Sequence, residues 1–113
     1  MKVIVAGGRN FCDYELLCKK LDIILSRQKD IQIVCGEARG ADSLGRRYAE
    51  ERGYTILSYP ANWEKYGKSA GFRRNEQMAQ VADALVAFWD GQSKGTYNMI
   101  KLMQNKPTRI IKY

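Results

Sequence analysis

The stretch "KVIVAGGRN", residues 2–10, decides the fold. Residues 2–6, "KVIVA", form an almost unbroken apolar run, which is typical of a strand buried on both faces. Gly7 and Gly8 follow, and glycines let the chain turn sharply and expose its backbone N–H groups. Apolar residues at helical spacing come next, so the stretch predicts a strand, a tight turn and a helix in that order.

The same unit recurs along the chain. Further strands are predicted at residues 31–35, 54–59, 83–89 and 108–113, and helices over 16–25, between Asp42 and Gly53, over 73–81 and over 97–104. Residues 60–71, "PANWEKYGKSAG", are predicted to form a long loop. Strands that alternate with helices form right-handed crossover units. The chain is therefore predicted to be one α/β domain, residues 1–113, with four helices and a five-stranded parallel sheet in the order 3-2-1-4-5.

The composition limits the partners and the catalytic groups that we expect for this chain. The net charge of +7 favours anionic partners, without distinguishing a nucleotide from a polynucleotide. Three cysteines form no CxxC pair and histidine is absent, so we expect no metal, no disulfide framework and no Ser-His-Asp or Cys-His catalysis. We see neither a signal peptide nor an apolar run long enough to span a bilayer. We therefore expect a cytoplasmic protein that has no membrane partner and no cofactor.

The unusual residues follow the strands. The segments "GGR", "GEARGAD" and "DGQSKGT" lead out of strands, whereas "RQKD", "ERG" and "NKP", which lead back into strands, are plain. In an open parallel sheet the first group lies at the carboxyl edge, where ligands bind near the topological switch point. This asymmetry predicts a ligand pocket at that edge.

Several side chains in these loops suit an anionic ligand that carries an aromatic base. Arg39 lies between two glycines, and its guanidinium fork fits a phosphate or carboxylate. Arg73 and Arg74 are expected at the start of a helix, where cations are unfavourable unless an anion joins them. Ser93 or Thr96 is expected to cap a helix that presents a second anion seat. Trp63 is expected to stack on a base rather than to pack in the core.

Two further residues lie in or beside the second loop, and Asp42 has two possible roles. Asp42 either caps the helix that it begins or contacts a ribose hydroxyl. Cys35 borders the loop and is expected to be an inert buried thiol. The full set of expected ligand-binding residues is Gly7, Gly8, Arg9, Gly36, Glu37, Arg39, Gly40, Asp42, Trp63, Arg73, Arg74, Asn75, Asp90, Gly91, Ser93, Lys94, Gly95 and Thr96.

Four motifs carry a resemblance to a known family. In order and spacing, "AGGR", "GEARGAD", "YPANWEKYGKSAGFRRNEQM" and "DALVAFWDGQSKGT" resemble the YspA/YpsA-related branch of the SLOG superfamily, from Val3 to about Met103. The resemblance implies a Rossmann-like three-layer sandwich that binds nucleotides or nucleotide-derived ligands. The superfamily includes the lonely-guy phosphoribohydrolases and DNA-processing protein A, and the resemblance implies that this protein comes from a bacterium or a phage.

The phosphoribohydrolases can be compared motif by motif. Their R-K-x-x-M motif is similar to residues 74–78, which implies an anion-contacting role for Arg74. Their P-G-G-x-G-T-x-x-E motif is similar to residues 91–99, which keep the phosphate-cradling Gly95 and Thr96 but have Asn98 and Met99 where the catalytic acid is expected. An amide cannot act as a general base, so the resemblance implies binding without hydrolysis.

Three functions remain open from the sequence. The favoured one is binding, either sensing or sequestering, of a nucleotide or nucleotide-derived ligand. The second is an N-glycosidic hydrolase of the phosphoribohydrolase type that uses a displaced carboxylate, with Glu37, Asp42 and Glu76 as the catalytic candidates. The third is nucleic-acid binding through the basic surface. A homo-oligomer is compatible with all three.

Overall fold

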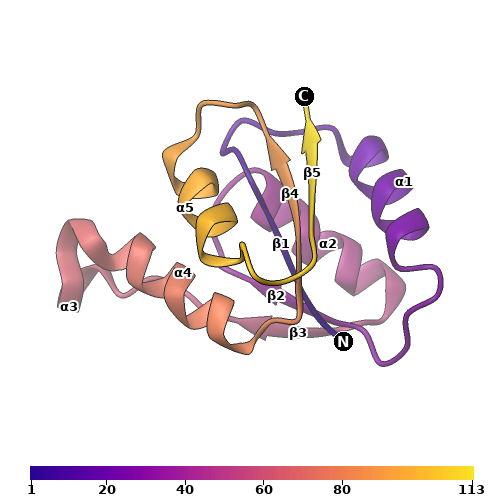
Figure 1. Ribbon diagram of the computed structural model, residues 1–113, viewed down its shortest axis with the longest axis horizontal. Coiled ribbons are helices and arrows are strands. Elements are labelled where there is room, and N and C mark those ends of the chain that lie inside the picture. Colours follow the sequence, from indigo (N-terminus) through magenta and orange to yellow (C-terminus); the bar gives the residue numbers. More distant parts are fainter.

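The computed structural model describes all residues, 1–113, and its sheet has five parallel strands in the order β3-β2-β1-β4-β5. The strands are β1 (Lys2–Gly7), β2 (Gln32–Cys35), β3 (Thr55–Ser58), β4 (Ala84–Trp89) and β5 (Thr108–Lys112). Each neighbouring pair is parallel, and β1 lies in the middle (Figure 1). The predicted strand order is confirmed.

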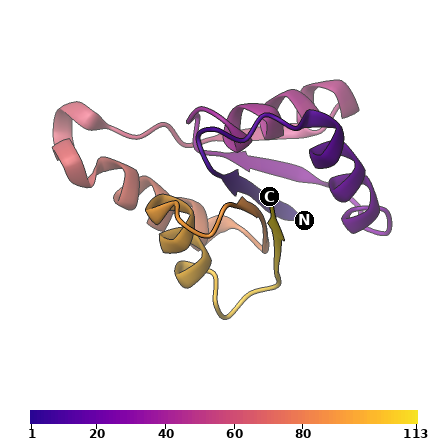
Figure 2. The same ribbon diagram turned by 90° about the horizontal axis from the view of Figure 1, so that it is seen from above.

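Four long helices cover the sheet in two layers. Helices α1 (Tyr14–Ile24) and α2 (Ala41–Arg52) lie on one face, and α4 (Ala70–Val81) and α5 (Lys94–Leu102) lie on the other (Figure 2). The three-layer, Rossmann-like architecture is therefore confirmed.

Alternation along β1 explains why the sheet is buried on both faces. Val3 and Val5 pack into the core beneath α1 and α2, whereas Ile4 and Ala6 pack into the core beneath α4 and α5. All four residues are buried, as a central parallel strand requires. Because all the strands are parallel, the turns that follow them meet at the carboxyl edge of the sheet.

The predicted long loop at residues 60–71 is wrong in part. It contains a one-turn helix, α3 (Trp63–Tyr66), and a 3₁₀ turn, Gly67–Ser69, and α4 begins at Ala70 rather than at residue 73. The physical reason is a cap, because the Asn62 side chain accepts a hydrogen bond from the Lys65 amide at 3.0 Å. The two arginines of "FRRN" therefore lie one turn inside α4, not at its start.

The turn before α2 predicts a steric test of the fold. Gly40 has φ 76°, and a Cβ there would lie 2.7 Å from the Cα of Arg9, whereas Gly53 has φ 73° but no atom within 4 Å of such a Cβ. We predict that Gly53→Ala lowers the free energy of unfolding by about 1–2 kcal/mol, the cost of a left-handed residue. Gly40→Ala should lower it by roughly 3 kcal/mol or more, because steric overlap adds to that cost. Urea denaturation measures both, and equal losses would contradict the close contact at Gly40.

Candidate functional site

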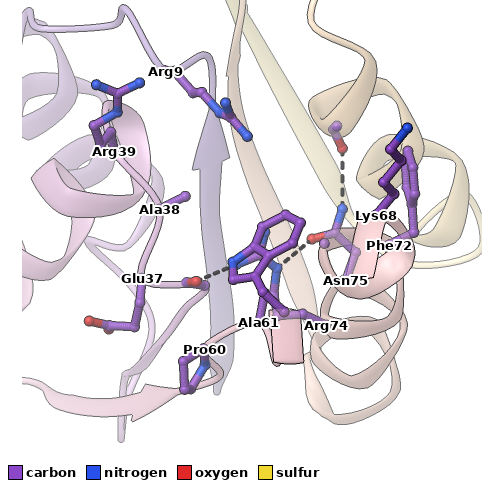
Figure 3. A pocket seen from close by; sticks show the side chains of 14 residues that line it. Arg9, Glu37, Ala38, Arg39, Pro60, Ala61, Lys68, Phe72, Arg74 and Asn75 are labelled. Carbon is purple, nitrogen blue, oxygen red and sulfur yellow. Dashed lines mark hydrogen bonds between the residues drawn. The ribbon is translucent and has the colours of Figure 1, made fainter. Parts of the chain in front are cut away.

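A hollow of about 480 Å³ opens at the carboxyl edge, between the loop that follows β2 and the segment from β3 to α4 (Figure 3). We call it the outer hollow, and its volume lies in the range of small-molecule sites. Its lining residues are Arg9, Gly36, Glu37, Ala38, Arg39, Pro60, Ala61, Trp63, Lys68, Gly71, Phe72, Arg74, Asn75 and Gly95.

A smaller compartment of about 100 Å³, the inner cup, adjoins the outer hollow. The two share five lining residues: Arg9, Ala38, Arg74, Asn75 and Gly95. The inner cup adds Ala6, Gly7, Asp42, Ser93, Thr96 and Met99. Residues from the turns after β1, β2 and β4 therefore line one continuous space.

Arg74 is held at the floor of this space by two acceptors. Its Nη1 donates to the carbonyl oxygen of Gly36, and its Nε donates to Oδ1 of Asn75 at 3.0 Å (Figure 3). A Cβ on Gly36 would lie 2.6 Å from Nη1, so only glycine admits the guanidinium at this place. Burial lowers the pKa of Arg74 from its usual value, and the nearby Asp42 opposes that shift. The second terminal nitrogen, Nη2, donates to no protein acceptor and is available to a ligand.

Asn75 joins α4 to the start of α5. Its side chain is buried, and its Nδ2 donates to the carbonyl oxygen of Gly95 at 3.3 Å and to Oδ1 of Asn98 at 3.0 Å. Because its Oδ1 accepts from Arg74, the amide uses both of its ends within the protein. Asn75 thus fixes the position of Arg74 relative to α5.

The α5 N-terminus is organised by Ser93 and Asp90. Ser93 is the N-cap, because its Oγ accepts from the Thr96 amide at 3.4 Å and lies 3.0 Å from the Thr96 hydroxyl. Asp90 accepts from the amides of Gln92 and Ser93, both at 2.8 Å, and these bonds hold the pKa of its carboxyl below the usual value. Of the two residues expected to cap this helix, Ser93 does so, and the adjacent Thr96 is buried.

Asp42 does not cap α2. Gly40 takes the N-cap position and Ala41 begins the helix, so Asp42 is the second helical residue and lines the inner cup. Its side chain is buried, and the burial raises the pKa of its carboxyl to about 6, against the opposing effects of Arg74 and the Ala38 amide. The cup therefore holds one carboxyl group that resists ionisation.

The structure brings twelve of the expected ligand-binding residues to this space: Gly7, Arg9, Gly36, Glu37, Arg39, Asp42, Trp63, Arg74, Asn75, Ser93, Gly95 and Thr96. It places six outside the lining: Gly8, Gly40, Arg73, Asp90, Gly91 and Lys94. Of the catalytic candidates, Glu37 lines the outer hollow and Asp42 the inner cup, whereas Glu76 is exposed on α4 and lines neither.

Packing explains three of the excluded residues. A Cβ on Gly8 would collide with the Tyr113 hydroxyl, and one on Gly40 with the backbone of Gly8 and Arg9. Arg73 lies over the Tyr66 ring, 4.5 Å from its centroid, and its Nε donates to the Ser69 hydroxyl. These residues shape the loops around the hollow rather than its surface.

Several lining residues were missed by sequence reasoning: Ala38, Pro60, Ala61, Lys68, Gly71 and Phe72. Pro60 and Ala61 follow β3, so the carboxyl-edge rule could have included them. Lys68 lies in the 3₁₀ turn and Phe72 in the first turn of α4, and no local pattern signals which way these side chains face. Met99, where an acid was expected, lines the inner cup.

The expectation that Cys35 is an inert thiol can be compared with the structure. Cys35 is buried, and burial together with Asp42 and Glu37 raises the pKa of its thiol to about 12, so this residue is an inert thiol at neutral pH.

Cys, Asp and Glu side chains form no cluster of three that could hold a metal ion. None of the helices is both long enough and apolar enough to traverse a bilayer.

The fold and its carboxyl-edge site define a Rossmann-like α/β domain. A sequence profile described as "YspA, cpYpsA-related SLOG family" matches residues 1–66. The Gene 61 protein of Mycobacterium phage D29 is 31% identical over 119 residues, which cover 99% of this chain and 95% of that protein. The chain belongs to the YspA/cpYpsA-related SLOG family, as the four sequence motifs indicated.

Solved structures share the fold. DNA processing protein A from Streptococcus pneumoniae matches with a TM-score of 0.73 and 15% identity, over 96% of this chain and 49% of that one. This chain therefore spans about half the length of that relative. A protein named TM1055 matches with a TM-score of 0.67 and 22% identity, over 95% and 71% of the two chains. At these identities the matches establish the fold alone.

The raised pKa of Asp42 predicts a pH-dependent effect of its removal. The folded protein holds the Asp42 proton more tightly than the unfolded chain, so Asp42 ionisation reduces stability as the pH rises from the ordinary value of 3.8 through about 6. We compare the free energies of unfolding of Asp42→Asn and the wild type. We predict that their difference shifts by roughly 2 kcal/mol in favour of the variant when the pH is raised from about 4 to about 7.5. Urea denaturation of both proteins at the two pH values tests this, and a difference independent of pH would contradict it.

Proposed function

We propose that the outer hollow and inner cup bind a nucleotide or nucleotide-derived ligand, which the protein senses or sequesters without converting it. The observation that carries the proposal is the fixed guanidinium of Arg74. Two of its nitrogens are engaged by Gly36 and Asn75, which leaves Nη2 for an anion. A guanidinium that is already oriented loses little conformational entropy when it binds phosphate.

The N-terminus of α5 supplies the second half of the phosphate seat. The first amides of a helix lack acceptors within the helix, and the helix dipole favours an anion there. The Ser93 side chain accepts from the Thr96 amide, but the Gly95 amide precedes it and remains for a ligand. Arg74 and Gly95 line the same inner cup, so one phosphate has access to both.

Gly95 supports this assignment because the fold does not require a glycine there. Its φ is not positive, and no atom lies within 4 Å of a Cβ built on it. Gly95 is the second residue of α5, where glycine is a poorer helix former than alanine, by up to about 1 kcal/mol. A ligand that approaches the α5 backbone closely accounts for a residue that packing does not explain.

The aromatic residues of the outer hollow provide a place for the base. Trp63 is 56% exposed and Phe72 is 46% exposed, and both line the hollow. Exposed aromatic faces stack on nucleobases with little dependence on the base. Membership of the SLOG family agrees with a ligand related to nucleotides.

The lining of the inner cup on the α5 side favours binding over catalysis. Met99 is apolar, and the Asn98 amide is engaged by Asn75, so α5 presents no acid or base to a ligand. Asp42 is the only carboxylate that lines the cup, and Glu37 is the only one that lines the outer hollow, so a hydrolase would have to depend on one of these two.

Arg74 provides the direct test. With AMP as the probe, we predict that Arg74→Ala weakens binding by about 1.5–3 kcal/mol, the range for a hydrogen bond to a charged group. Arg74→Lys should recover only part of this loss, because an ammonium lacks the planar fork. Arg73→Ala is the matched control, since Arg73 occupies the same helix but lies outside the lining. Isothermal titration calorimetry gives the affinities, and thermal unfolding shows which variants remain folded.

The other two functions give different results in the same experiment. Chromatography of the recovered probe should show intact AMP. Release of adenine by the wild type, but not by Asp42→Asn or not by Glu37→Gln, would establish a hydrolase instead. Strongly salt-dependent binding of DNA or RNA, with no affinity for AMP, would establish a nucleic-acid-binding protein.

Gly95→Ala separates stability from binding. Because the added methyl group meets no protein atom, the variant should gain up to about 1 kcal/mol in free energy of unfolding from the better helix former. AMP affinity should fall about tenfold, since the methyl group occupies the space of the phosphate. Stability comes from urea denaturation and affinity from calorimetry. An unchanged affinity would show that the ligand does not approach the start of α5.

A further inference from the structure

The outer hollow carries more positive charge than one phosphate requires. Besides Arg74, three cationic side chains line it: Arg9, Arg39 and Lys68. None of these three takes part in an ion pair of the structure, since the ion pairs involve only Arg46, Arg47 and Arg52 with acidic partners. Like charges that gather in one concave site repel one another unless an anion joins them.

The acidic residues of the site do not offset this charge. Glu37 is the one acidic residue that lines the outer hollow, and Arg46 of α2 already pairs with it at 2.7 Å. Asp42 lies in the inner cup beside Arg74, so its charge acts mainly on that guanidinium. Three cations therefore remain for a ligand after the inner phosphate seat has been filled.

These cations surround the hollow in a definite arrangement. Arg9 lines both compartments, so it is adjacent to the inner seat. Figure 3 shows Arg39 on the wall formed by the loop after β2, and Lys68 on the opposite wall, next to Phe72. The Arg9 side chain reaches toward the centre of the hollow, whereas the Arg39 and Lys68 side chains lie on its two sides (Figure 3).

We propose that the ligand carries at least two phosphoryl groups, as a nucleoside diphosphate or another pyrophosphate-containing nucleotide does, with the second group held in the outer hollow by Arg9, Arg39 and Lys68. This inference rests on the proposed nucleotide-binding function and specifies its ligand class. One phosphate monoester brings a charge of about −1.5 to −2 at neutral pH, which Arg74 and the α5 N-terminus suffice to bind. A second phosphoryl group gives the three remaining cations, which are exposed to solvent in the structure, an anion to bind.

The test compares mono- and diphosphates of the same nucleoside. Calorimetry at one fixed salt concentration uses AMP with ADP, and GMP with GDP, so that an unfavourable base does not hide the effect. We expect the diphosphate of a pair to bind about tenfold more tightly or better than its monophosphate, which corresponds to one additional charge-assisted hydrogen bond.

A double variant assigns the gain to the outer hollow. Arg39→Gln with Lys68→Gln should abolish the advantage of the diphosphate, so that the two nucleotides of a pair bind within about twofold of each other, because Arg74 and α5, which hold the first phosphate, are untouched. The matched control is Lys65→Gln with Arg73→Gln, which removes the same net charge from side chains that lie over the Tyr66 ring outside the lining. The control should retain the diphosphate advantage.

The results separate the two proposals. If the monophosphates bind and the diphosphates bind no more tightly, the ligand-class inference is overturned and the nucleotide-binding function stands. The ligand-class inference is also overturned if the double variant and its control lose the diphosphate advantage equally, because bulk charge would then explain the preference. If none of the four nucleotides binds, the proposed function falls and the inference falls with it.

Discussion

The site depends on the close backbone approach of three turns at the carboxyl edge. The Gly8 amide donates to the Phe88 carbonyl oxygen at 3.1 Å, and the Gly8 carbonyl oxygen accepts from the Ala41 amide at 3.3 Å. These two bonds tie the turn after β1 to β4 and to the start of α2. A Cβ on Gly7 would lie 2.7 Å from the Cβ of Ala41, so no larger residue fits this junction. The turns converge because their glycines have no side chains, and the hollow is the space that their outer surfaces enclose.

Within this frame, one guanidinium joins elements that are distant in the sequence. Arg74 of α4 reaches the Gly36 carbonyl oxygen of the β2 turn, and Asn75 carries the connection onward to α5. A half-buried cation with its donors only partly used is unfavourable for folding, and so is the buried Asp42 beside it. Groups that stability alone does not favour, gathered in one cavity, are a physical mark of a binding site.

The division of the site into two compartments links its shape to its chemistry. The inner cup combines a fixed arginine with a helix N-terminus, whereas the outer hollow combines exposed aromatic rings with exposed cations. Oriented donors in the inner cup suit one orientation of the proposed phosphate, and the exposed side chains of the outer hollow are free of ion pairs in the structure, apart from Glu37. On the α5 side the cup is lined by Ser93, Gly95, Thr96 and Met99, none of which ionises at neutral pH.

The sequence by itself determined the strands, the long helices, their order in the sheet and the edge at which the hollow opens. Apolar periodicity and glycine-rich turns are local signals, and right-handed crossovers leave few topologies for them. Only the tertiary structure decided which residues share the hollow. Arg73 and Arg74 are neighbours in sequence, but successive helical residues point about 100° apart, so one lies over Tyr66 and the other reaches Gly36. Likewise, Gly40 and Gly95 look equivalent in the sequence, yet the first is required by packing and the second is not, because that difference depends on what lies opposite in space.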